Sequence, residues 1–528
     1  MSLIIKRVVL AVLVCITLSA LSLAQADSSL AGKKLIEFGT FFPDPSFIRQ
    51  NIDEMEKIPF DGVAIETGKA WKMWSRTRLN PGDLQPAIED LKATKFGRFT
   101  DNFIYMVTFF PTKQDEMGFF DPDWSSIAYN AACLARVAKE SGCKGLLIDP
   151  EDYAPAGIWS YTGSRVNTGH SYEEYVTKAR ERGREFIRAI SKEYPDITIL
   201  ILHGYEISAS HSEEYPLLRH FLDGICEAAE PGMVLVDGYE KSYGYVSPKL
   251  FKDGRKEILT EGKAKSSSPS AYEQHVRMGF GIWLDYGREI CDSPEVFRAA
   301  LSNAMAKSDK YVWVYSERVR WWDPICSRPA SVPDPYIKAL GLARKGPGPG
   351  KHPAEREFPP AKATKISGHD DAETFAEMKK TMTEVFDFPK DGWKLKYDES
   401  KSGLEMWNGA KLDDSKWLPV SIGKFWDEMY GKHEGYGWYR LKFTAPAKTD
   451  GKQIFLIVGA ADESAWVWLN SWKVGSHADD DYEESWQQAF ALDVTPYIRP
   501  GQENDLAIRV LNREGAGGLW KSIKLMEK

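Results

Sequence analysis

Short apolar runs alternate with amphipathic stretches along roughly the first two thirds of the chain. Each run is five to eight residues long, which suits a strand buried on both faces of a parallel sheet. The runs are Leu35–Phe42, Gly62–Thr67, Phe103–Phe110, Gly145–Asp149, Ile197–His203, Met233–Asp237, Phe280–Asp285 and Tyr311–Tyr315. The pattern therefore predicts eight buried strands.

The stretches between these runs predict helices, because their apolar residues return with a helical period. They include Ser46–Lys57, Ser125–Ser141, Ser171–Tyr194, Tyr215–Ala229 and Pro294–Ser308. Eight β-then-α units in succession predict an α/β fold, a (β/α)8 TIM barrel over residues 27–344. A doubly wound open sheet is the alternative, but no Gly-x-Gly-x-x-Gly turn follows the first run.

The C-terminal part of the chain has a different pattern. Residues 384–528 contain short alternating runs separated by Pro and Gly, and hold 10 of the 18 Trp residues. No helical period of useful length occurs there, so we expect an all-β jelly-roll sandwich. The Gly-Pro repeat of Lys345–Gly350 suits neither helix nor strand, so residues 345–383 are predicted to be a linker.

The first 26 residues predict a signal peptide. Lys6 and Arg7 precede the apolar run Val8–Leu23, and Ala24-Gln25-Ala26 is a small-x-small cleavage site. Later apolar runs are too short to cross a bilayer. We therefore expect a secreted or periplasmic protein, cleaved after Ala26, with no membrane partner after cleavage.

Charge and cysteine usage limit the partners. The net charge is −8, and cleavage removes Lys6 and Arg7 to leave −10, which argues against nucleic acid. The five cysteines after the signal peptide show no C-x-x-C pair and no metal-ligand spacing, so we expect no metal site among them. Their odd number leaves at least one free thiol. The sequence gives no indication of oligomeric state.

Candidate chemistry is concentrated after the fourth run. Asp149 and Glu151 lie two residues apart, so in an extended segment they point to the same side. Repulsion between them raises the pKa of one carboxyl group and makes a general acid usable near neutral pH. A helix N-cap is the alternative, but it explains only Asp152. A calcium site is disfavoured because such sites alternate carboxylates with backbone oxygens in a Gly-containing loop.

A second carboxylate is expected at the same face, because barrel active sites lie at the C-terminal ends of the strands. Glu317 and Asp285 are the candidates. We favour Glu317, which lies two residues beyond its run and precedes Arg318, Arg320 and two tryptophans, whereas Asp285 is also explained as a cap. An ion pair between Glu317 and one arginine is the structural alternative.

Other polar and aromatic residues follow the strand ends or lie in the loops after them, and are candidates for substrate binding. They are Glu66, Trp159, His203, Asp237, Tyr239 and Trp321. Aromatic rings and hydroxyl-binding groups together suit a carbohydrate cleft. A hydrophobic plug is the alternative for the tryptophans, and a supporting partner is the alternative for Glu66.

Several motifs carry a resemblance to known families. The segments Gly437–Phe443, Ala460–Asn470, Val474-Gly475, Leu492–Tyr497 and Asn504–Val510 resemble the galactose-binding-like jelly roll of family 2 glycosidases. The barrel resembles retaining (β/α)8 glycosidases, whose acid/base glutamate ends the fourth strand and whose nucleophile ends the seventh. Glu151 fits the first position, although Pro150 replaces the usual Asn and Glu317 follows the eighth strand. Asp149-Pro-Glu151 also looks like the end of the Asp-x-Glu motif of family 18 hydrolases.

Together with the signal peptide, these resemblances imply a secreted glycoside hydrolase that uses two carboxylates, and no metal or other cofactor, to cleave O-glycosidic bonds in a polysaccharide or oligosaccharide. Glu151 would donate the proton, and Glu317 or Asp285 would be the second carboxylate. One alternative is a substrate-assisted N-acetylhexosaminidase that uses Asp149 and Glu151, with Tyr239 as a candidate partner. Another is a non-catalytic carbohydrate-binding protein, because fold does not imply function.

Overall fold

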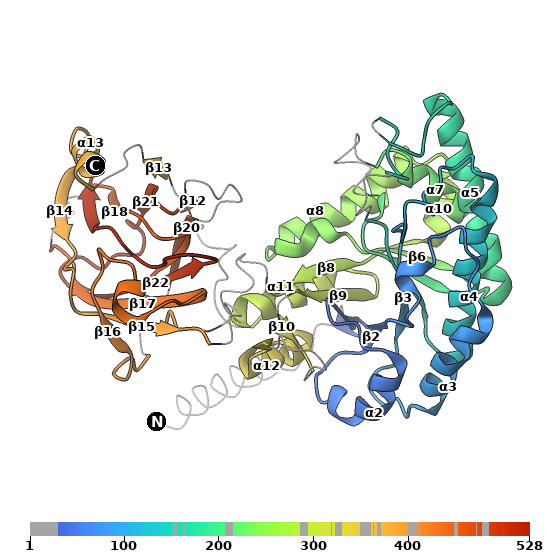
Figure 1. Cartoon of the computed structure of the whole chain (residues 1–528), viewed down its shortest axis with the longest axis horizontal. Coiled ribbons are helices and arrows are strands. Elements are labelled where there is room, and N and C mark those ends of the chain that lie inside the picture. Colours follow the sequence, from blue (N-terminus) through green and yellow to red (C-terminus); the bar gives the residue numbers. More distant parts are fainter. Residues whose placement is uncertain are drawn as a thin grey trace, which may run out of the picture. The chain divides into compact units, whose positions relative to one another are not determined.

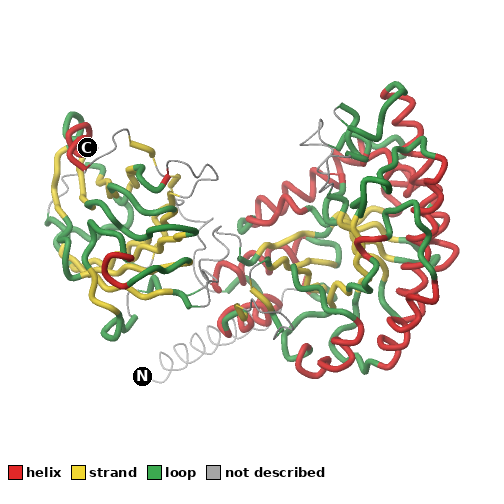
Figure 2. Tube along the Cα trace, in the orientation of Figure 1, coloured by secondary structure: helices red, strands yellow, loops and turns green. Residues whose placement is uncertain are grey.

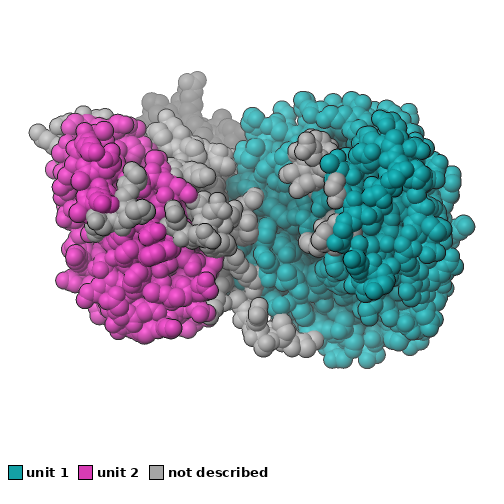
Figure 3. Space-filling model, turned by 45° about the horizontal axis from the view of Figure 1, so that its top comes forward, with its two compact units in different colours: residues 1–327, 332–350 teal, residues 328–331, 351–528 magenta. Residues whose placement is uncertain are grey.

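The computed structural model describes residues 30–151, 157–162, 164–205, 215–285, 294–317, 319–322, 330–348, 361–362, 364–366, 371–399, 405, 407–409, 412–447, 452–470, 472–477 and 485–528. The chain divides into two compact units, Met1–Ser327 with Val332–Gly350 and Arg328–Ser331 with Lys351–Lys528 (Figure 3). The predicted signal peptide lies outside the described residues. Among those residues, no helix has the length and apolar character needed to span a bilayer.

Parallel strands form the centre of the first unit, in the order β7-β6-β5-β4-β3-β2-β1-β9-β8. They are β1 (Lys34–Gly39), β2 (Gly62–Ile65), β3 (Phe103–Val107), β4 (Gly145–Asp149), β5 (Thr198–Ile201), β6 (Val234–Asp237), β7 (Val276–Met278), β8 (Phe280–Trp283) and β9 (Tyr311–Ser316). All eight predicted strands are present, and β4 has the predicted bounds.

A single interrupted strand closes this sheet into a barrel. β7 pairs with β6, whereas β8 pairs with β9, and only Gly279 separates β7 from β8. The Gly279 N–H donates to the Asp237 carbonyl at 2.7 Å, and an added Cβ would lie 2.9 Å from Val236. Glycine at this position therefore lets one strand serve both neighbours, which confirms the predicted (β/α)8 barrel.

Helices lie outside the barrel strands (Figures 1 and 2). They are α2 (Pro45–Met55), α3 (Gln85–Ala93), α4 (Ser125–Ser141), α5 (Tyr172–Glu193), α7 (Leu218–Ala228), α8 (Pro248–Lys256), α10 (Pro269–His275), α11 (Pro294–Lys307) and α12 (Asp334–Leu342). Local signals set their ends: the Ser171 side chain forms a capping box with Glu174, and α4 ends at Gly142 with φ 76°. All five predicted helices are present.

Large side chains fill the barrel interior. The buried cluster includes Phe38, Tyr105, Tyr243 and Trp313. The Trp313 ring occupies the space that a side chain at Gly281 would take, since an added Cβ would lie 2.5 Å from it. Its indole N–H donates to the Gly238 carbonyl at 2.8 Å, so a polar bond fixes the ring beneath the loop after β6.

The second unit is an antiparallel β-sandwich with one parallel edge pair, β12 with β20, as predicted for the C-terminal part of the chain (Figure 2). One sheet has the order β12-β20-β19-β22-β17-β15-β16, and the other β13-β21-β18-β23-β14. Their strands are β12 (Ala361–Lys362), β13 (Thr364–Ile366), β14 (Thr383–Asp387), β15 (Trp393–Tyr397), β16 (Leu418–Val420), β17 (Gly435–Thr444), β18 (Ile454–Val458), β19 (Ser464–Leu469), β20 (Trp472–His477), β21 (Ala489–Asp493), β22 (Glu503–Asn512) and β23 (Ile523–Glu527). A large apolar cluster lies between the sheets.

The structure corrects the predicted linker. β12 and β13 pair with β20 and β21, and helix α13 (Asp371–Met378) packs Phe375 against the sandwich. The second unit therefore begins at about Lys351 rather than at residue 384. Strands of two and three residues are too short to show a period, so the sequence pattern could not reveal them.

Candidate active site

Two carboxylates and one imidazole meet at the C-terminal ends of β4, β5 and β6. The Nε2 atom of His203 lies 3.2 Å from an oxygen of Glu151 and 2.8 Å from an oxygen of Glu240. One ligand-type atom from each residue lies within 4.8 Å of the other two. Of the two carboxylates, Glu151 is the more accessible, with 34% side-chain exposure against 15% for Glu240.

Asp149 lies directly below this cluster and is buried. Its carboxylate accepts the backbone N–H of Glu151 at 3.0 Å and the hydroxyl of Tyr105 at 3.3 Å. Burial, followed by the charges of Glu151 and Glu240, raises the pKa of Asp149 to about 7, against the opposing effect of His203. Asp149 therefore retains its proton at pH values at which a solvent-exposed Asp is fully ionised.

Two further aspartates predicted as site residues, Asp237 and Asp285, hold loops at the strand ends. Asp237 accepts the backbone N–H groups of Tyr205 at 2.7 Å and Tyr239 at 3.1 Å. Asp285 accepts those of Glu317 at 2.9 Å and Val319 at 2.8 Å. Both side chains are buried, so they fix the loops rather than line a cleft.

Glu240 is not among the residues predicted from the sequence, whereas its neighbour Tyr239 is. Tyr239 adopts a left-handed conformation with φ 47°, and its hydroxyl donates to Glu257 at 2.7 Å. Its ring packs near Gly254 of α8, away from the cluster. With this backbone angle the Tyr239 side chain turns away from the cluster, whereas that of the next residue, Glu240, reaches His203.

The two tryptophans predicted to bind substrate, Trp159 and Trp321, are both buried. Trp321 is buried against Phe60 and Phe297, with a ring-centroid distance of 4.8 Å to Phe60. Trp159 is buried as well, but its N–H donates to the carbonyl of Pro150 at 2.8 Å. Trp159 therefore supports the backbone between Asp149 and Glu151, and Trp321 is a hydrophobic plug.

The remaining candidates lie around the same mouth. Glu317 is exposed, and its backbone carbonyl accepts the Thr40 hydroxyl at 2.7 Å. Glu66 accepts the backbone N–H groups of Lys69 and Ala70, so it caps a short helical turn. Burial is the main cause of the raised pKa of Tyr315, and the charges of Glu317, Asp285, Glu240 and Asp149 add to it. Tyr315 therefore lies among the carboxylates of the mouth.

Aromatic rings border the carboxylate cluster. Tyr243 stacks on Tyr315 with centroids 5.7 Å apart, and Trp283 meets Tyr315 edge-on at 5.0 Å. Trp71, 40% exposed, meets Phe109 edge-on at 5.9 Å. The sequence pattern predicted aromatic rings in the loops, such as Trp71, but not those of Tyr243, Trp283 and Tyr315.

The cluster offers metal ligands as well as acid–base groups. Glu151, His203 and Glu240 supply two carboxylate oxygens and one imidazole nitrogen, a donor set that suits zinc or a similar cation. In the structure the His203 Nε2 atom contacts an oxygen of each carboxylate.

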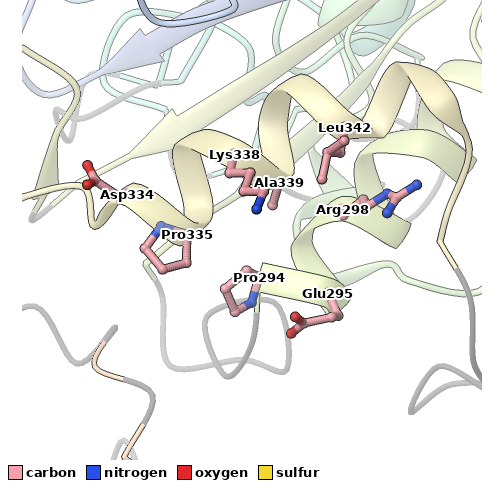
Figure 4. A pocket seen from close by; sticks show the side chains of 8 residues that line it. All are labelled: Pro294, Glu295, Arg298, Asp334, Pro335, Lys338, Ala339 and Leu342. Atoms are coloured by element: carbon pink, nitrogen blue, oxygen red, sulfur yellow. The ribbon is translucent and has the colours of Figure 1, made fainter.

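A pocket on the outside of the barrel is unrelated to this mouth. Its volume is about 470 Å³, and α11 and α12 supply its lining (Figure 4). The side chains around it are Pro294, Glu295, Arg298, Asp334, Pro335, Lys338, Ala339 and Leu342. No residue from the end of a barrel strand contributes, so the pocket has no counterpart of the Glu151 cluster.

Three of the five cysteines after the signal peptide are described, and each is a buried free thiol: Cys133, Cys143 and Cys226. The other two, Cys291 and Cys326, lie outside the described residues, as does Asp152. Burial raises the pKa of Cys226 to about 12 and that of Cys143 to about 11. These thiols are therefore unreactive at neutral pH.

Comparison with known proteins places the resemblance in the sandwich. A family model described as "Beta-galactosidase second all-beta domain" matches residues 405–516, which confirms the predicted likeness to a glycosidase all-β domain. A β-glucuronidase of Paenibacillus borealis is 31% identical over 124 residues, 23% of this chain and 20% of that protein. A β-glucuronidase of Formosa agariphila is 26% identical over 129 residues, 22% of this chain and 12% of that protein.

Solved structures show a similarly local match. A glycosyl hydrolase family 2 member from Bacteroides cellulosilyticus is 26% identical, with a TM-score of 0.23, over 27% of this chain and 20% of that chain. A Ruminococcus gnavus β-glucuronidase is 16% identical, with a TM-score of 0.24, over 28% and 29%. The chain thus spans a fifth or less of the length of the two curated relatives.

Proposed function

We propose that this protein is a glycoside hydrolase whose barrel cleaves O-glycosidic bonds with Glu151 and Glu240 as the carboxylate pair. The observation that carries the proposal is the approach of their oxygens to within 4.8 Å across His203. Retaining glycosidases hold their two carboxyl groups about 5–5.5 Å apart, and inverting enzymes about 6.5–9.5 Å. The spacing therefore favours a retaining reaction.

Exposure divides the two roles. Glu151 is the more accessible carboxyl group, so it is assigned as the acid that protonates the leaving oxygen. Glu240 is less exposed, so it is assigned as the nucleophile that attacks the anomeric carbon. In the second step Glu151 would take a proton from water, and the water would release the sugar from Glu240. His203 contacts both carboxylates and keeps their spacing fixed.

Electrostatics support an acid at this position. The pKa of Asp149 is about 7, raised first by burial and then by the charges of Glu151 and Glu240, so Asp149 retains a proton beside the acid near neutral pH. Its bond to the backbone N–H of Glu151 holds the acid in place. The acidic mouth also favours a sugar without a carboxylate at the cleaved residue, even though the curated relatives are named β-glucuronidases.

A substrate-assisted N-acetylhexosaminidase is the second candidate. The observation in its favour is the direct hydrogen bond between the Asp149 carboxylate and the backbone of Glu151, which places two carboxyl groups behind one leaving group. The expected partner, Tyr239, is turned toward Glu257. An N-acetyl requirement in the substrate would favour this candidate.

For either activity we propose that the protein is exported. N-terminal sequencing of the mature protein tests this proposal, and the expected first residue is Asp27.

Azide rescue tests the carboxylate pair. In Glu240→Ala, azide should restore turnover of an activated aryl glycoside and yield a glycosyl azide of inverted anomeric configuration. Glu181→Ala, on the outer surface of α5, is the matched control and should keep wild-type turnover. Rescue of Glu317→Ala instead of Glu240→Ala would assign the nucleophile to the eighth strand and overturn the proposed pair.

A further inference from the structure

The β-sandwich carries a pocket of its own at one end of its sheets. Its volume is about 910 Å³, and no residue of the barrel lines it. The lining residues are Phe425, Asp462, Glu463, Trp486, Arg513, Glu514, Gly515 and Ala516. They come from segments far apart in the sequence, so the fold has assembled the pocket.

Strand register shows why these segments meet. Ser464 at the start of β19 pairs with Leu511 near the end of β22. Val458 at the end of β18 pairs with Ile523 of β23 and with Phe490 of β21. The loop before β19, the loop after β22 and the turn before β21 therefore share one end of the sandwich. Such loop clusters are where β-sandwiches commonly bind ligands.

Stacked aromatic rings form one side of this region. Phe425 stacks on Trp520 with centroids 5.0 Å apart, and Trp486 stacks on the same ring at 5.5 Å. The Trp520 N–H donates to the Trp486 carbonyl at 2.8 Å, which fixes the stack. Phe425 and Trp486 also line the pocket, so the stack presents apolar ring surface to a ligand.

Asp462 supplies a polar group to the same pocket. It is 8% exposed, and none of the described residues donates a hydrogen bond to its carboxyl group. Its backbone is fixed by a bridge to Gly518 in the loop after β22. Glu463 adds a second carboxyl group to the lining, and its Oε2 atom is buried with no hydrogen-bond partner among the described residues. An unpaired buried polar atom costs stability, so a ligand hydroxyl that donates to it would be favoured here.

We propose that this pocket binds one neutral pyranose residue of a carbohydrate chain, at a site separate from the barrel. Rings on one side match the apolar face of a sugar, and carboxylates accept its hydroxyl groups. Asp462, Glu463 and Glu514 outnumber the single cation of the lining, Arg513. This charge balance disfavours an acidic sugar. The proposal does not depend on the activity assigned to the barrel.

Titration of the full-length protein with methyl glycosides tests the site. The probes are the methyl glycosides of glucose, galactose, mannose, xylose and N-acetylglucosamine, with methyl glucuronide as the acidic comparison, and binding is followed by calorimetry. At least one neutral glycoside should bind saturably and more tightly than the glucuronide. Trp486→Ala and Asp462→Asn should each weaken that binding at least tenfold, whereas Trp472→Ala should not change it.

Trp472 is a suitable control because it is 42% exposed and lies at the opposite end of the same sheet, paired with Leu469. Absence of saturable binding by every neutral glycoside would overturn the proposal. Tighter binding of the glucuronide, or binding of Ca²⁺ alone that Asp462→Asn abolishes, would also overturn it. Loss of barrel activity in Glu240→Ala with intact sandwich binding would leave the two proposals separately tested.

Discussion

The barrel mouth and the sandwich pocket combine the same kinds of side chain in different geometries. At the mouth, Glu151 and Glu240 converge on the single imidazole of His203. In the sandwich, Asp462 and Glu463 line a pocket beside stacked rings, and no histidine is among the residues that line it. Acid–base chemistry requires two carboxylates at a fixed separation, whereas sugar binding requires a ring face and acceptors. Geometry, rather than composition, is therefore the basis on which we propose catalysis in one region and binding in the other.

The largest expected effect tests this division at the barrel. Glu151→Gln keeps the shape of the side chain but removes the proton to be donated, so kcat should fall by about 10²–10⁴. The loss should be smaller for an aryl glycoside with an acidic leaving group, because such a group departs with little protonation. Steady-state kinetics on both substrates would measure the difference. If instead kcat depended on the leaving group in Asp462→Asn and not in Glu151→Gln, catalysis would belong to the sandwich and not to the barrel.

The second prediction uses a property that both regions share. Burial is the main cause that raises the pKa of Asp149 and of Asp462 to about 7. A raised carboxyl pKa stabilises the fold below the unfolded value of about 3.9, and this contribution is lost as pH rises through about 7. For Asp149 the loss is at most about 4 kcal/mol. Urea unfolding at pH 5 and pH 8 should show it.

Asparagine variants assign the pH effect to a unit. Asp149→Asn should remove the pH dependence from the unfolding of the barrel, and Asp462→Asn from that of the sandwich. The coupled charges of Glu151 and Glu463 are retained in these variants, so the isosteric change isolates the aspartate. If the free energy of unfolding changed between pH 5 and pH 8 as much in both variants as in the wild type, other groups would cause the pH dependence.

The sequence predicted the architecture well because barrel strands are long apolar runs and the helices are amphipathic. Asp149 and Glu151 were found for the same reason, since they follow such a run directly. Glu240 was missed as a site residue because a left-handed Tyr239 decides which neighbour faces the mouth, and no period encodes that angle. The sandwich pocket was not predicted because its lining depends on the register of five strands, which the sequence pattern does not reveal.

The third prediction compares two aspartates that hold loops at these sites. Asp285 accepts the N–H groups of Glu317 and Val319, whereas Asp427 accepts that of Gly517 at 2.8 Å. Asparagine would retain an acceptor but lose the charge, so Asp285→Asn should cost about 1–3 kcal/mol and Asp427→Asn about 1 kcal/mol. Denaturant unfolding measures both. Equal costs would show that the number of amide bonds does not determine how firmly each loop is held.

The smallest effects come from two tryptophans that support a loop carbonyl in each region. The Trp159 N–H donates to Pro150 at 2.8 Å, between Asp149 and Glu151, and the Trp520 N–H donates to Trp486 at 2.8 Å. Phenylalanine keeps much of the ring and removes the donor, at a cost of about 1 kcal/mol. A free carbonyl lets the loop shift, so Trp159→Phe should lower kcat a few-fold, and Trp520→Phe should weaken glycoside binding a few-fold. Each variant is measured for both kcat and glycoside binding. If Trp159→Phe changed glycoside binding more than kcat, the two regions would not be functionally distinct.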